Sequence, residues 1–201
     1  MIDKIDQLAR LKQKCQDLVA QVYPLQNKVV VFGEGNANAR IVLVGEAPGA
    51  EETVQQRPFV GKAGKNLDVF LNRLSLQRDD IYITNVVKFR PVKANDASGR
   101  LSNRPPTREE IALFCPLLQK ELEIIRPQVV VTLGNVPLQA FTDKKTVIGS
   151  VHGGAHASLP RALPYVLFPL YHPASIIYNR ALAETYAQDL DNLAVFLETL
   201  S

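Results

Sequence analysis

Cysteine is scarce in this sequence: only Cys15 and Cys115 occur among its 201 residues. Two cysteines are too few for the disulfide framework of a secreted protein. No uninterrupted apolar run reaches the roughly 20 residues that a membrane-spanning helix needs. The N-terminal residues, in which Asp3, Lys4 and Asp6 interrupt the apolar positions, lack the core of a signal peptide. These absences predict a cytoplasmic protein with no membrane segment.

Repeats, linkers and low-complexity segments are also absent. The contents of hydrophobic residues (46%) and charged residues (21%) are ordinary for a globular protein. A chain of 201 residues can bury a substantial core without dividing into domains. Residues 1–201 are therefore expected to form a single domain.

The net charge is only +3, but basic residues concentrate between positions 88 and 108, where a single acid, Asp96, opposes them. Prolines stiffen this segment, and it follows an apolar run that predicts a buried strand. A surface of nearly one sign suits contacts with nucleic-acid phosphates, which give affinity without sequence information. A solvated loop is the alternative. The basic residues of the segment are Lys88, Arg90, Lys93, Arg100, Arg104 and Arg108.

Strands and helices alternate along the chain. Helical spacing of apolar residues, and a capping box in which Thr107 precedes Glu110, predict helices. Short aliphatic or β-branched runs predict strands between them. This alternation indicates an α/β fold with a parallel sheet covered on both faces. The expected helices cover residues 2–22, 67–74, 107–125, 136–141 and 181–200, and the expected strands 29–32, 41–44, 81–87, 129–133 and 165–170.

Three of the expected strands have a polar residue within them or just after them: Asn85 lies within one, and Glu46 and His172 follow two others. Each could serve only its local turn or a satisfied structural contact. The carboxyl ends of parallel strands share one edge of a sheet, however, so these side chains could meet there. Together with Phe59, they would supply a carboxylate, an amide, an imidazole and an aromatic face. That combination suits the binding of a flat heterocycle.

Four motifs then resemble the uracil-DNA glycosylases, and in particular the prokaryotic type-4 group, whose members usually carry a four-iron, four-sulfur cluster. They read Gly-Glu-Ala-Pro-Gly-Ala-Glu-Glu, Arg-Pro-Phe-Val-Gly-Lys-Ala-Gly, Ile-Thr-Asn-Val-Val-Lys and His-Pro-Ala. Shorter matches at 32–36, 103–107, 133–134 and 189–190 extend the resemblance over nearly the whole chain, in the same order. The four motifs span residues 45–52, 57–64, 83–88 and 172–174.

The resemblance implies an α/β/α sandwich of three layers around a central parallel sheet. It also implies hydrolysis of the N-glycosidic bond of deoxyuridine in DNA, after the base has flipped out of the stack into a pocket. Phe59 would stack on the flipped pyrimidine. Asn85 would read its edge, because one amide can accept from uracil N3–H and donate to O4. By family position, Glu52 would lie near C5 and help to exclude the methyl group of thymine.

Cleavage of this bond develops negative charge on the departing uracil, and His172 would donate a hydrogen bond to O2. The wider superfamily often places a polar, water-positioning residue directly after the position of Glu46. That place is taken here by Ala47, which is expected to line the substrate site. Glu46 is then expected to position the water, with backbone carbonyls as the alternative.

The cysteine pattern departs from that of the type-4 group. The group has four cysteine ligands, whereas the matching positions here hold Cys15, Leu18, Phe89 and Cys115. Four thiolates normally hold such a cluster. The sequence therefore predicts no cofactor and no metal site, with Cys15 and Cys115 a vestigial pair that packs as small buried hydrophobes.

The expected function is that of a DNA-repair glycosylase acting on uracil-containing DNA as a monomer, with no repair-pathway partner indicated. Two alternatives stay open. One is a relative with little or no activity that binds uracil or single-stranded DNA through the same pocket. The other is a glycosylase for another deaminated base such as hypoxanthine.

Overall fold

The fold is built on a six-stranded sheet with the strand order β1-β3-β2-β6-β8-β7. The computed structural model describes residues 3–94, 101–158, 162–179 and 181–200. The four inner strands are parallel, as predicted, but β1 and β7 run antiparallel at the two edges. In sheet order the strands are β1 (Glu34–Gly35), β3 (Tyr82–Asn85), β2 (Ile41–Gly45), β6 (Val129–Leu133), β8 (Ala162–Leu170) and β7 (His156–Ser158).

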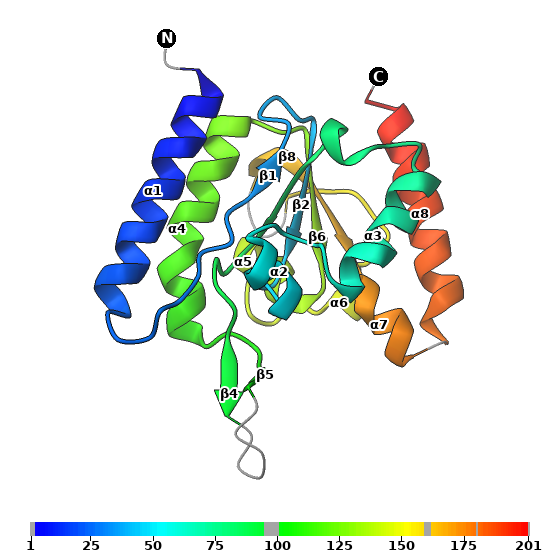
Figure 1. Cartoon of the computed structure of the whole chain (residues 1–201). Helices are drawn as coiled ribbons and strands as arrows, with labels where there is room; N and C mark the ends of the chain where they lie inside the picture. The colour runs from blue at the N-terminus through cyan, green and yellow to red at the C-terminus, as the bar shows by residue number, and fades with distance from the viewer. Residues whose placement is uncertain (1–2, 95–100, 159–161, 180, 201) are drawn as a thin grey trace.

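Helices cover both faces of the sheet, which gives the predicted α/β/α sandwich (Figure 1). On one face lie α1 (Lys4–Val22) and α4 (Arg108–Ile125), which pack against each other. On the other face lie α3 (Lys62–Arg73) and α8 (Leu182–Glu198). The shorter helices are α2 (Ala50–Gln55), η1 (Arg78–Asp80), α5 (Asn135–Phe141), α6 (Ile148–Val151) and α7 (Pro173–Tyr178). Among the described residues, no helix is both long and apolar enough to cross a bilayer.

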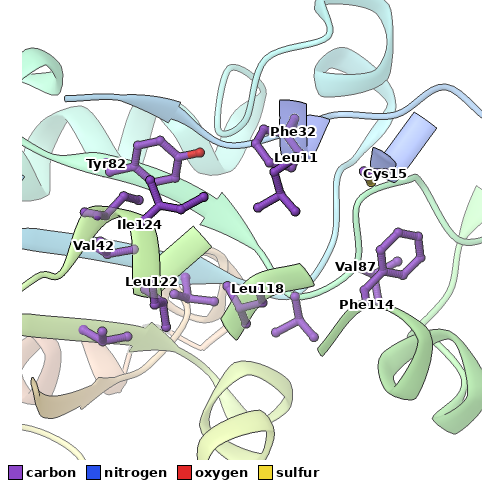
Figure 2. Packing of buried hydrophobic residues seen from close by; sticks show 14 of the residues in the cluster. Leu11, Cys15, Phe32, Val42, Tyr82, Val87, Phe114, Leu118, Leu122 and Ile124 are labelled. Carbon is purple, nitrogen blue, oxygen red and sulfur yellow. The ribbon is translucent and has the colours of Figure 1, made fainter. Parts of the chain in front are cut away.

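Each face of the sheet carries its own hydrophobic cluster. Figure 2 shows part of the cluster on the α1–α4 side, which includes Leu11 and Cys15 of α1 and Phe114 and Leu118 of α4. Every residue of β2 and β6 is buried, because helices lie on both sides of these strands. The continuous aliphatic runs in the sequence reflect this double burial.

The capping box predicted for α4 is present. The Thr107 hydroxyl accepts from the backbone N–H of Glu110 at 3.2 Å, and the Glu110 carboxylate accepts from the N–H of Thr107 at 2.7 Å. Two orphan donors at the start of the helix are thereby satisfied. Arg104 adds a bidentate ion pair to the same carboxylate, with N–O distances of 2.6 and 2.7 Å.

Two regions differ from the expectations. Residues Val29–Phe32 do not form the expected strand, and the short edge strand lies instead at Glu34–Gly35. Val30, Val31 and Phe32 are nonetheless buried, so packing rather than a ladder of hydrogen bonds accounts for their apolarity. The basic segment contains a hairpin of β4 (Val92–Ala94) and β5 (Leu101–Asn103), which projects beyond α4 in Figure 1.

Candidate active site

A cavity of about 420 Å³ lies at the edge of the sheet formed by the carboxyl ends of the parallel strands, and its lining includes residues that end or follow β2, β3 and β8. Gly45, the last residue of β2, is paired in register with Asn85, the last residue of β3. The crevice outside the carboxyl ends of parallel strands is the usual ligand site of such sheets. The cavity is lined by Ala47, Gly49, Ala50, Glu51, Glu52, Phe59, Gly61, Asn85, Asn103, His172 and Ala174.

The floor of the cavity depends on the absence of a side chain at position 45. A Cβ on Gly45 would overlap the Oδ1 atom of Asn85 and would come within 2.6 Å of Cζ of Phe59. Phe59 itself lies 4% exposed and adopts a left-handed backbone conformation with φ of 53°. Its ring centroid is 6.1 Å from that of His172, and the two ring planes are inclined by 30°. Gly45 thus lets the aromatic ring and the amide share one small space.

Asn85 is 3% exposed, yet its side-chain amide forms no hydrogen bond with the described residues. Because this amide lines the cavity, its donor and acceptor are available to a bound ligand. The backbone carbonyl of Asn85, in contrast, accepts from the ammonium of Lys88 at 2.8 Å.

His172 precedes α7 and forms its N-cap, since its Nδ1 accepts from the backbone N–H of Ala174 at 3.1 Å. The ring proton of the neutral imidazole must therefore reside on Nε2, which makes that nitrogen a donor. Burial lowers the pKa of His172 below its usual value, although the charge of Glu52 acts in the opposite direction. The cavity thus contains a neutral imidazole donor.

Glu52 connects the two turns that form one wall of the cavity. One carboxylate oxygen accepts from the N–H of Gly49 at 3.1 Å, and the other accepts from the N–H of Gly61 at 2.8 Å. A Cβ on either glycine would press against this carboxylate. Glu52 therefore shapes the wall and fixes the turns on either side of α2.

Glu46 follows β2 directly, and its half-buried carboxyl group has its pKa raised by burial. It forms no side-chain hydrogen bond with the described residues, and it is not among those that line the cavity. The neighbouring Ala47 does line it. The structure thus brings Ala47, Glu52, Phe59, Asn85 and His172 together around one space, with Glu46 beside them in the chain.

Contrary to the prediction that it contacts DNA, Lys88 does not belong to the basic surface. Its side chain is fully buried and forms an ion pair with the equally buried Glu121. The ammonium also donates to the Thr84 hydroxyl at 2.7 Å and to the carbonyl of Asn85 at 2.8 Å. A buried charge needs such partners, and these partners hold the side chain in the interior.

The other basic residues of the segment have different surroundings. Lys93 and Arg108 are exposed, Arg104 is paired with Glu110, and Arg100 lies outside the described residues. Arg90 is half-buried and donates from Nε to Oδ1 of Asn103 at 2.6 Å. Asn103, on β5, lines the cavity, which connects the hairpin to the site. The sequence placed Asn103 within a matching motif but gave no signal that its side chain reaches the site.

The two cysteines lie near the α1–α4 contact. Cys15 is fully buried, which raises the pKa of its thiol to about 12, and burial also raises the pKa of the half-buried Cys115. Phe89 fills the space nearby, with ring contacts to Tyr23 and Phe114 at centroid distances of 5.1 and 5.5 Å. Within the described part of the chain, no group of three or more His, Cys, Asp or Glu side chains is placed to hold a metal.

Curated relatives are similar over most of the chain. The type-4 uracil-DNA glycosylase of Saccharolobus solfataricus is 35% identical over 94% of this chain and 84% of its own length. The type-4 enzyme of Archaeoglobus fulgidus is 39% identical over 81% of this chain and 79% of its own length. The corresponding enzyme of Thermotoga maritima is 40% identical, covering 84% of this chain and 83% of its own.

These relatives overturn the prediction that the chain has no cofactor, because they are type-4 enzymes, and the resemblance to that group implies an iron–sulfur cluster. Two missing cysteines are not sufficient ground for excluding a cluster in a member of such a group. The residues at the matching positions still supply only the thiols of Cys15 and Cys115. These two thiols do not fit the arrangement of four thiolates that normally holds such a cluster.

The family model of the uracil DNA glycosylase superfamily matches residues 32–198. That range includes all six strands of the sheet and every residue that lines the cavity. The fold, the matched range and the identity to the curated relatives agree. The chain belongs to the uracil-DNA glycosylase superfamily.

Proposed function

We propose that this protein is a uracil-DNA glycosylase that hydrolyses the bond between uracil and deoxyribose in DNA. One observation carries the proposal. An amide with no partner among the described residues, a neutral imidazole donor and an aromatic ring line a single cavity of about 420 Å³. A flat base with polar edges can use all three groups at once.

Recognition begins with extrusion of the nucleotide, since the base is inaccessible within a duplex. Phe59 provides an aromatic face on which the pyrimidine stacks. The Asn85 amide accepts from uracil N3–H and donates to O4. Cytosine presents an amino group at position 4 and a bare N3, so the same orientation of Asn85 leaves buried polar groups unpaired. Such mismatches discriminate strongly between similar substrates.

Cleavage places negative charge on the leaving uracil and positive charge on the sugar. The Nε2–H of His172 donates to uracil O2 and stabilises the charge that develops there. A neutral donor suffices for this task, because uracil departs as a stabilised anion. Phosphates of the substrate oppose the positive charge on the sugar.

Glu46 is the carboxylate that we assign to positioning of the water. Both oxygens of Glu52 are already occupied by backbone N–H groups, and Glu51 is exposed to solvent. Glu46 is half-buried and follows the same strand as Ala47 in the cavity wall. Its oxygens have no partner among the described residues, which leaves them available to a water molecule.

The wall held by Glu52 is proposed to limit the room beside C5 of the pyrimidine and so to disfavour thymine. Arg90, Lys93, Arg104 and Arg108, together with Arg100, are proposed to contact the phosphates of the DNA. The proximity of the hairpin to the cavity supports this, since Asn103 of β5 lies in the lining. Phosphate contacts would position the strand without reading its sequence.

Purified protein incubated with single- and double-stranded oligonucleotides that contain one uracil tests the activity. Alkali then breaks the strand at each abasic site. We expect strand breaks with the wild-type protein and a large loss of breaks with the double variant Asn85→Ala, His172→Ala. Breaks no more frequent than those of the double variant would overturn the proposal. Retained gel-shift binding in that case would identify a binding protein instead.

The chain is proposed to act as a monomer and as one domain, in the cytoplasm, where its DNA substrate would lie. Light scattering of the purified protein should give a mass near 22.3 kDa. Unfolding in urea should show one cooperative transition.

A further inference from the structure

We propose that Arg78 is a positioning residue that holds Phe59 in the conformation required for stacking. The inference rests on the proposed function, because it assigns a role to the residue that would stack on the base. Arg78 lies outside the cavity and touches none of the reacting atoms. It acts through the backbone on which Phe59 is carried.

The guanidinium of Arg78 binds two successive carbonyl oxygens of the loop that contains Phe59. Its Nη1 donates to the carbonyl of Phe59 at 3.0 Å, and its Nη2 donates to that of Pro58 at 2.8 Å. Only arginine offers several donors in a rigid planar fork that can bind two neighbouring oxygens. The side chain is only 27% exposed, so water competes weakly for these bonds.

The backbone of Phe59 needs such support. Its φ of 53° lies in the left-handed region, which is unfavourable for a residue with a Cβ atom. Strained conformations of this kind persist when surrounding contacts determine them. Gly64 is part of these surroundings, because a Cβ there would overlap the Phe59 carbonyl. The carbonyl is thus held by Arg78 and approached closely by a glycine.

Arg78 also connects the two recognition residues. It is the first residue of η1, which leads directly into β3, and β3 ends at Asn85. The same guanidinium approaches the carboxylate of Glu34 at 3.4 Å, and Glu34 is paired with Ile83 of β3. The loop of Phe59 is therefore fastened to the strand that carries Asn85. This arrangement would hold the Phe59 ring and the Asn85 amide at a fixed distance and orientation.

Arg57 provides a matched control. It forms a bidentate ion pair with Glu34, at 2.9 and 3.0 Å, but donates to neither carbonyl of the loop. Loss of Arg57 removes a guanidinium and an ion pair from the same cluster and leaves both bonds of Arg78 in place. A difference between the two variants thus reflects the loss of the hydrogen bonds from Arg78 to the loop carbonyls rather than the loss of a positive charge.

The first experiment measures amide hydrogen exchange by NMR at Gly61 and Gly64, the amides next to Phe59 that have hydrogen-bond acceptors, in the wild-type protein, Arg78→Ala and Arg57→Ala. We expect at least tenfold faster exchange in Arg78→Ala and less than a twofold change in Arg57→Ala. Amides of β6 report global stability and should exchange alike in all three. Equal exchange at Gly61 and Gly64 in Arg78→Ala and in the wild type would overturn the proposal.

The second experiment measures kcat/KM on a uracil-containing oligonucleotide in a double-mutant cycle. We expect Arg78→Ala to lower kcat/KM at least tenfold in the wild-type background and less than twofold in the Phe59→Ala background. Arg78→Lys should restore only part of the loss. A general structural defect would instead lower kcat/KM equally in both backgrounds. If the wild-type protein releases no uracil, the proposed function fails, while the exchange experiment still decides the role of Arg78.

Discussion

Lys88 and Glu121 form an ion pair in which both side chains are completely buried. The pair lies beneath the carboxyl end of β3, where the ammonium also binds the carbonyl of Asn85. Removal of one partner would leave an uncompensated charge in the interior. This ion pair therefore contributes to the stability of the fold and helps to fix the position of the Asn85 backbone.

Replacement of Lys88 by Met should lower the free energy of unfolding by about 3–5 kcal/mol, because Glu121 would remain buried without its partner. Glu121→Gln keeps the shape of the partner and should cost less. Lys120→Met is the control, since the Lys120–Glu123 pair is exposed and should contribute at most about 1 kcal/mol. Urea unfolding measures all three. Similar losses for Lys88→Met and Lys120→Met would contradict the buried-pair explanation.

Substitution of Gly45 by Ala should abolish most of the activity. The new methyl group would displace the Asn85 amide and the ring of Phe59 from their common space. We expect kcat/KM to fall by at least tenfold, with a stability loss of about 1–3 kcal/mol from overpacking. Gly149→Ala is the matched control, because its Cβ would meet only the Tyr171 hydroxyl at 3.7 Å. An unchanged kcat/KM in Gly45→Ala would show that the floor of the cavity can relax.

His172→Ala should lower the single-turnover rate by about 10²–10³-fold, the usual loss for one donor to a developing anion. The wild-type rate should stay constant as the pH falls through 6.5, the ordinary pKa of histidine, because burial lowers the pKa of His172. It should decline only at lower pH, where a protonated Nδ1 no longer accepts from Ala174. Rates measured from pH 5 to 8 test this. A midpoint at or above 6.5 would contradict a neutral donor.

The same lowered pKa has a consequence for stability. Near pH 6.5 the unfolded chain binds a proton at His172, whereas the folded chain binds it only at lower pH. Stability therefore rises with pH across that window. The contribution is complete above pH 6.5 and is lost as the pH falls toward the lowered pKa. Comparison with His172→Gln isolates this component in urea unfolding.

Several features of this fold follow from local sequence. The aliphatic runs of β2 and β6 and the capping box of α4 are determined by neighbouring residues, and each lies where it was expected. The meeting of Asn85 and His172 at one edge follows from the parallel order of the inner strands.

Features that depend on long-range contacts could not be predicted in this way. Lys88 stands in a basic segment, and the buried carboxylate that neutralises it belongs to Glu121, 33 positions later in the chain. Arg78 binds carbonyls about 20 positions earlier in the chain, and nothing in the local pattern indicates those bonds. The edge strand Glu34–Gly35 consists of two residues and is too short to show the alternation of apolar and polar residues that indicates a strand.

The basic segment should determine the salt dependence of DNA binding. Alanine at Arg90, Lys93 and Arg108 should lower the slope of log K against log salt by about 0.9 for each lost phosphate contact on duplex DNA. Lys12→Ala and Lys14→Ala, on the exposed side of α1, provide the control and should leave the slope unchanged. Fluorescence anisotropy with labelled duplexes gives the slope. An unchanged slope in the triple variant would place the DNA on another surface.

Glu46→Gln should separate water positioning from the other tasks of the site. The amide retains the size of the carboxylate but loses its charge, so we expect the single-turnover rate to fall by at least tenfold with little change in DNA affinity. Glu51→Gln is the control, because Glu51 lines the cavity but is exposed, and its rate should stay within twofold of the wild type. Since burial raises the pKa of Glu46, the Glu46-dependent part of the rate should already decline at a pH above the ordinary carboxyl range. If Glu46→Gln kept the wild-type rate, the result would indicate that backbone carbonyls, rather than Glu46, position the water.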